Sequence, residues 1–86
     1  MLVTFTDDVS LVGRGKRVAS WSFSQGTGAN TINFRRGSVS GAIVFQIQLP
    51  ATTSASQSYN APLYVAEGVF VEVVATGLAV GCVDII

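Results

Sequence analysis

The 86 residues leave room for a single domain, residues 1–86, and their composition excludes most of the chemistry that such a domain could perform. There is no histidine and only one cysteine, Cys82, so neither an internal disulfide nor an ordinary zinc site can form. Only 12% of the residues are charged, against about 25% in an ordinary globular domain, and the net charge is zero. A small neutral chain of this kind tends to associate, so we expect it to oligomerise or to dock on a partner.

The beginning of the chain shows neither a secretory signal nor a membrane segment. Residues 1–6 alternate between apolar and polar positions and lack a basic region followed by a long apolar run. No stretch approaches the roughly 20 apolar residues of a membrane helix. We therefore expect a protein that is made in the cytoplasm and has no membrane partner.

The first half of the chain alternates with a period of two, which predicts β-strands. Residues 1–6 and 9–12 are predicted as strands on either side of a turn at Asp7-Asp8. Residues 17–24 have the most one-sided pattern and predict a half-buried antiparallel strand. Its predicted inner face consists of Ala19, Trp21 and Phe23, and its outer face of Ser20, Ser22 and Ser24.

The second half continues with a strand at residues 39–49, which ends at Pro50 because proline cannot donate to a β-ladder. Its predicted inner face carries Ile43, Phe45, Ile47 and Leu49. Residues 51–58 are polar and of low complexity, and are predicted to be an exposed loop. A short strand follows at residues 63–66. The last two strands, residues 69–75 and 78–85, are predicted to form a hairpin whose turn is Thr76-Gly77.

This C-terminal hairpin is apolar on both faces, which is typical of strands that are covered on both sides. A two-layer domain of this size covers only one face of each sheet. We therefore expect the second face to be buried against other copies of the chain. The predicted oligomer contacts are Phe70, Val74, Val80, Val83, Ile85 and Ile86.

No arrangement of residues indicates catalysis, and we expect no catalytic, cofactor-binding or metal site. Acyl transfer lacks a histidine base, and Cys82 lies in an apolar strand where burial would make its thiol inert. Residues 13–16, Gly-Arg-Gly-Lys, have the wrong spacing for a phosphate-binding loop. Asp7 and Asp8 could bind calcium, but no regular spacing of oxygen ligands accompanies them.

The basic residues form two clusters at predicted turns. One reading is that these charges are solvated, and the other is that they dock the protein on an acidic protein surface. Because five basic residues are balanced by five acidic residues, the sequence gives little indication of nucleic-acid binding. The predicted docking residues are Arg14, Lys16, Arg17, Arg35 and Arg36.

Three aromatic residues could form a sugar-binding platform. They are Trp21, Tyr59 and Tyr64. Core packing explains Trp21 better, because it shares a face with Phe23. Tyr59 and Tyr64 flank Pro62 and keep carbohydrate binding open as an alternative.

Frequent short strands with Gly/Ser turns and no helical periodicity predict the fold class. It is all-β: a small antiparallel β-sandwich or jelly-roll-like domain with no significant helix.

The strand at residues 41–48, GAIVFQIQ, and the apolar end from Glu67 to Ile86 resemble the small β-sandwich virion proteins of tailed bacteriophages, of the capsid cement or decoration type. The resemblance implies a non-enzymatic structural protein that stabilises a shell as a homotrimer docked on the major capsid protein. It implies a location on the capsid exterior after assembly in the host cytoplasm, with no cofactor and no nucleic-acid partner. The alternative is a carbohydrate- or receptor-binding β module of a phage fibre, spike or tail.

Overall fold

β-Strands are the dominant secondary structure of the chain. A computed structural model describes residues 1–25, 28, 30–50, 53–74 and 78–86, and within these ranges it contains eight strands and no helix. The described part accordingly holds no helix that could cross a membrane. The strands are β1 (Leu2–Phe5), β2 (Val9–Ser10), β3 (Arg17–Gln25), β4 (Asn30–Arg36), β5 (Ile43–Leu49), β6 (Ser54–Tyr64), β7 (Val69–Val74) and β8 (Leu78–Ile85).

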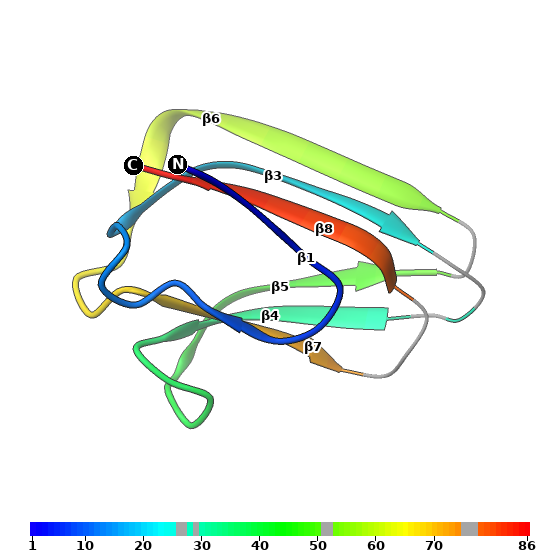
Figure 1. The fold of residues 1–86 in the computed structure, drawn as a ribbon, viewed down its shortest axis with the longest axis horizontal. Coiled ribbons are helices and arrows are strands. Elements are labelled where there is room, and N and C mark those ends of the chain that lie inside the picture. Colours follow the sequence, from blue (N-terminus) through cyan, green and yellow to red (C-terminus); the bar gives the residue numbers. More distant parts are fainter. Residues whose placement is uncertain (26–27, 29, 51–52, 75–77) are drawn as a thin grey trace.

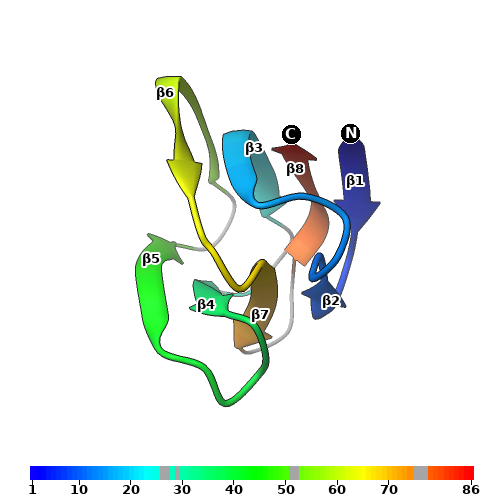
Figure 2. The ribbon, with the colours of Figure 1, turned by 90° about the vertical axis from the view of Figure 1, so that its left-hand side faces the viewer.

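The strands form two antiparallel sheets that lie face to face (Figure 2). The first sheet has the order β1-β8-β3-β6, and the second sheet has the order β2-β7-β4-β5. This arrangement confirms the predicted all-β sandwich.

The pairing is nested: β1 pairs with β8, β2 with β7, β3 with β6 and β4 with β5. Among the eight described strands, β4 and β5 are the only consecutive strands that belong to the same sheet. A long hairpin wrapped over itself in this way is a jelly roll. The wrapping brings the β2–β3, β4–β5 and β6–β7 loops to the same end of the sandwich, beside the first and last residues (Figure 1).

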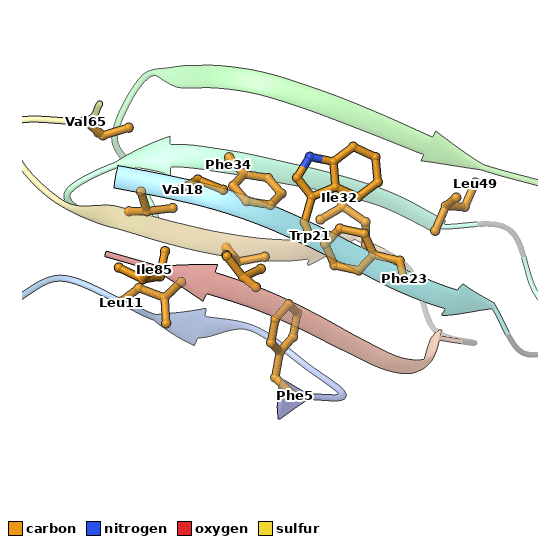
Figure 3. Packing of buried hydrophobic residues seen from close by; sticks show 13 residues of the cluster. Phe5, Leu11, Val18, Trp21, Phe23, Ile32, Phe34, Leu49, Val65 and Ile85 are labelled. Atoms are coloured by element: carbon orange, nitrogen blue, oxygen red, sulfur yellow. The ribbon is translucent and has the colours of Figure 1, made fainter. Parts of the chain in front are cut away.

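The hydrophobic core fills the space between the two sheets (Figure 3). Phe23 is fully buried at its centre, with ring centroids 5.9 Å from Phe5, 5.5 Å from Trp21 and 6.2 Å from Phe34. The predicted core positions Trp21 and Phe23 are therefore confirmed. The remaining buried hydrophobic residues are Leu11, Val18, Ile32, Leu49, Val65, Val69, Val71, Val83 and Ile85.

A bulge in β5 makes one core prediction wrong. Phe45 pairs with Phe34, whereas Ile43 pairs with the next residue, Arg35, so Val44 is an extra residue in the ladder. An extra residue reverses the alternation of faces. Ile43 consequently lies on the outer face and is 44% exposed, while Phe45 and its neighbour Ile47 are partly buried against the core.

A second bulge shifts the inner face of β3. Val18 pairs with Ile85 and Ser20 with Asp84, which leaves Ala19 without a place in the ladder. Val18 rather than Ala19 therefore points into the core, where it is fully buried.

The polar segment 51–58, which was predicted to be a loop, contributes Ser54–Ser58 to the longest strand, β6. β6 has 11 residues and pairs with β3, and Thr53 is the only described residue of the predicted loop outside it. The serines of β6 lie opposite serines of β3, so pairing with a central strand overrides the low intrinsic preference of this segment. The pairs are Ser54 with Ser24, Ser56 with Ser22, and Ser58 with Ser20.

The predicted C-terminal hairpin is also wrong. β7 lies in the second sheet between β2 and β4, and β8 lies in the first sheet between β1 and β3. The predicted turn at Thr76-Gly77 lies outside the described residues. The inner faces of the two strands meet across the core, where Val71 and Val83 are fully buried, whereas Phe70 and Val80 belong to their outer faces.

Candidate interaction surface

All five basic residues gather at one end of the sandwich. Arg14 and Lys16 lie in the β2–β3 loop, Arg17 begins β3, and Arg35 and Arg36 end β4. Backbone hydrogen bonds join these segments, from Val65 N to the carbonyl of Lys16 (2.6 Å) and from Gly37 N to the carbonyl of Gly68 (3.1 Å). We call residues 11–17, 35–42 and 64–68 the basic end; it lies at the left of Figure 1.

The two predicted clusters differ in how their charge is used. Arg36 forms an exposed ion pair with Glu67 at 3.4 Å. Among the carboxylates, all of which belong to described residues, none lies within ion-pair distance of Arg14, Lys16 or Arg17. The β2–β3 loop and the first residue of β3 therefore carry the unpaired positive charges of the basic end.

Arg35 is held inside the subunit and is poorly placed for docking. Its Nε donates to Glu72 Oε1 at 3.0 Å, and its second guanidinium nitrogen donates to the carbonyl of Gly41 at 2.9 Å. The prediction that Arg35 faces a partner is therefore not supported by its geometry, because both interactions would have to break to free the guanidinium.

Exposed apolar side chains accompany the charges at the basic end. Val12 and Val39 are exposed in the β2–β3 and β4–β5 loops, and Tyr64 is exposed at the end of β6. The guanidinium of Arg17 lies 5.0 Å from the centroid of the Tyr64 ring, a cation–π distance. The basic end therefore combines charge with apolar area that a partner could cover.

The opposite end of the sandwich has the opposite sign. Asp7 and Asp8 occupy the turn between β1 and β2, and Asp8 Oδ1 accepts a hydrogen bond from Val73 N at 2.8 Å. No group of three or more metal-ligating side chains occurs among the described residues. The two ends of the domain thus differ in charge although its net charge is zero.

The outer face of the second sheet carries a hydrogen-bonded polar network that was not predicted from the sequence. Glu72 Oε1 accepts from Asn33 Nδ2 at 2.8 Å as well as from Arg35, and Gln46 donates to Asn33 Oδ1 at 2.7 Å. The hydrogen bond from Asn33, followed by that from Arg35, holds the pKa of Glu72 below its usual range. The sequence does contain a pattern that indicates this network: polar residues interrupt otherwise apolar strands, and they do so at positions that pair across the second sheet.

Acid should weaken this network in a way that depends on Glu72. A lowered carboxyl pKa stabilises the folded state above the ordinary glutamate pKa, about 4.3, and that contribution is lost as pH falls through the folded-state pKa. Glu72→Gln should therefore flatten the acid side of the stability profile, measured by urea midpoints at successive pH values. Glu67→Gln is the control, because it leaves the network intact. An unchanged acid slope in Glu72→Gln would contradict this role.

The six predicted oligomer contacts do not form one surface. Val83 and Ile85 are wrong, because their side chains fill the interior of the subunit itself. Of the others, Phe70 and Val74 lie on the outer face of the second sheet, with their pairing partners Arg35 and Thr31. Val80 lies on the outer face of the first sheet, opposite Ser24, and Ile86 is exposed beside the basic end.

Cys82 is also placed differently from the prediction. It is half-buried on the outer face of the first sheet, with its Sγ 3.7 Å from Thr4 Oγ1, because it alternates along β8 with the buried positions Gly81 and Val83. The three aromatic candidates likewise do not form a single platform. Trp21 is buried and donates its indole N–H to the Tyr59 hydroxyl at 3.0 Å, whereas Tyr64 is exposed next to Arg17.

Comparison with known protein families, curated proteins and solved structures finds no significant match to this chain.

Proposed function

We propose that the chain is a non-enzymatic structural protein that docks, through its basic end, on an acidic surface of a larger protein particle. The observation that carries this proposal is the convergence of the basic residues at one end. Arg14, Lys16 and Arg17 have no carboxylate partner there and stand beside exposed Val12 and Tyr64.

This combination of side chains suits protein docking. Uncompensated charges at the rim of an interface steer and orient the encounter, while apolar and aromatic side chains supply the area that is removed from water. An acidic capsid or tail surface would satisfy Arg14 and Lys16 without displacing an internal partner. The Arg36–Glu67 pair at 3.4 Å is exposed and could rearrange at little cost.

The particle is proposed to be a virion, in which the chain acts as a cement or decoration protein on the major capsid protein. The support is the resemblance of residues 41–48 and 67–86 to such proteins, together with the jelly-roll fold, which recurs in viral capsid proteins. In a density gradient of a lysate from the producing cells, an antibody to the chain should detect it in the particle fractions. A protein found only in the soluble fractions would overturn the proposal.

Neutralising the β2–β3 loop should weaken docking on those particles. Arg14→Gln with Lys16→Gln should lower the affinity by about tenfold at low salt, and the difference should shrink as salt screens the charges. Co-sedimentation of purified protein with particles stripped of it measures the effect.

The matched control is Ser24→Glu with Gln48→Glu, which changes the net charge equally at exposed positions away from the basic end. It should bind like the wild type. Equal affinities of all three proteins at low salt would show that Arg14 and Lys16 are ordinary solvated charges.

A receptor- or carbohydrate-binding role is the second candidate, and the exposed Tyr64 ring favours it. A sugar ring stacks on an exposed aromatic face, and the neighbouring Arg17 could donate hydrogen bonds to its hydroxyls. Binding to glycans that is lost in Tyr64→Ala but retained in the Arg14→Gln, Lys16→Gln protein would support this role in place of protein docking.

A further inference from the structure

The two edge strands on one side of the sandwich contain no charged residue. Residues 37–66 contain no Asp, Glu, Lys or Arg, and this segment supplies β5 and β6. These strands are edges of the second and the first sheet, respectively, and lie on the same side of the molecule (Figure 2).

The edge strands on the two sides of the sandwich differ in length and in charge. On the far side the edges are β1, with four residues, and β2, with two, and the charged turn Asp7-Asp8 joins them. Short strands and charges are how proteins prevent an edge from pairing with another chain. β6 is instead 11 residues long and uncharged, and as an edge strand it presents a row of unpaired backbone groups.

The protection that β6 does have is confined to one of its ends. Pro62 lies near the end of the strand, and the register with β3 shifts between Val18 and Ser20. From Ser54 to Ser58 the pairing with β3 is regular, so this stretch keeps a straight edge.

We propose that the partner of this edge is a second copy of the chain, and that the β6 strands of two copies pair antiparallel about a two-fold axis at Ser56. The pairing places Ser54 opposite Ser58, Ser56 opposite its own copy, and Ala55 opposite Gln57. Residues on the same face meet in every pair, so the sheet continues without a reversal of faces. Serine opposite serine is already the pairing that β6 makes with β3.

A second copy fits this side better than a charged partner does. No charge has to be removed from water when two uncharged edges meet, and no ion is left without a partner. Phe45 and Ile47, which are only partly buried on the neighbouring edge β5, would gain cover on the same side. The inference is independent of the proposed docking and does not require the particle. A two-fold pair also differs from the homotrimer that the resemblance implies.

The oligomeric state of the purified protein tests the proposal. Light scattering at micromolar concentration should give twice the 9.0 kDa mass of the chain. Ser56→Arg places like charges opposite each other at the axis, and should raise the dissociation constant of the dimer by about a hundredfold. Ser22→Arg is the matched control, because Ser22 is the cross-strand partner of Ser56 on the same outer face but lies in the inner strand β3. It should remain dimeric.

Hydrogen exchange supplies a second readout, in which the amides of β4 serve as an internal control for a general loss of stability. The amides of residues 54–58 that point away from β3 are hydrogen-bonded only in the dimer, so they should exchange faster in Ser56→Arg than in the wild type, while those of β4 keep the same rates. A wild-type protein with the mass of one or of three chains, or a Ser56→Arg protein that stays dimeric, would overturn the two-fold pairing. Loss of docking in the Arg14→Gln, Lys16→Gln protein leaves the dimer intact, so the two proposals can fail separately.

Discussion

Replacing Phe23 by alanine is expected to lower the free energy of unfolding by about 3–5 kcal/mol, which is a large part of the total for a small domain. The reason is that the Phe23 ring is fully buried and packs against rings from both sheets. It contacts Phe5 and Trp21 from the first sheet and Phe34 from the second, all with centroids within 6.2 Å. Removing it therefore opens a cavity at the point where the two layers are held together.

Urea denaturation of the purified protein measures this loss at constant protein concentration. Ser22→Ala is the matched control, since Ser22 adjoins Phe23 in β3 but is exposed on the opposite face, and should change the stability by about 0.5 kcal/mol or less. A loss below about 1 kcal/mol in Phe23→Ala would mean that this ring does not join the two sheets.

Gly81→Ala is expected to lower the free energy of unfolding by about 1–3 kcal/mol through overpacking. Gly81 is buried in β8, directly beneath two aromatic rings. A β-carbon added there would lie 2.8 Å from Phe5 Cε2 and 2.9 Å from Phe23 Cδ1, closer than side-chain atoms approach in folded proteins. Both rings would have to move, although the core around them is closely packed.

A double-mutant cycle with Phe5→Leu isolates the cause. If the added methyl group meets the Phe5 ring, Gly81→Ala should cost less in the Phe5→Leu background, by about 0.5 kcal/mol or more. Denaturation midpoints of the four proteins give this coupling. Equal costs in both backgrounds would show that the methyl group is accommodated without displacing Phe5.

The alternation of apolar and polar residues predicted most strands and the buried face of β3. It could not reveal the bulges at Ala19 and Val44, because an extra residue in a ladder depends on the partner strand. The misplacement of Ile43 follows from this alone, since the pattern of residues 43–49 is otherwise regular.

Which strands pair was harder to predict than where strands occur. A turn signal such as Thr76-Gly77 suits a hairpin and a connection between two sheets equally well. The segment 51–58 was predicted as a loop because it has no large apolar residue, yet Ser54–Ser58 forms a strand whose stability comes from β3. The local sequence of residues 51–58 does not indicate that β3 will be their partner strand.

The candidate interaction surface was predicted in its residues but not in its assembly. The sequence identified both basic clusters, and the nested topology, which no local pattern contains, brings them together. Arg35 shows the limit of reading charge alone, because its pairing with Glu72 joins residues 37 positions apart.

The nested pairing also constrains the order in which the protein can fold. In the described part of the chain, the β4–β5 hairpin is the only pair formed by consecutive strands. β1, in contrast, pairs with β8, which lies almost the full length of the chain away. The chain loses the entropy of closing such long loops before the stabilising contacts form. Folding is therefore expected to be slow, on the order of milliseconds to seconds. During synthesis, the first sheet cannot close until β8 has left the ribosome, so β1 and β3 spend that interval without their shared neighbour.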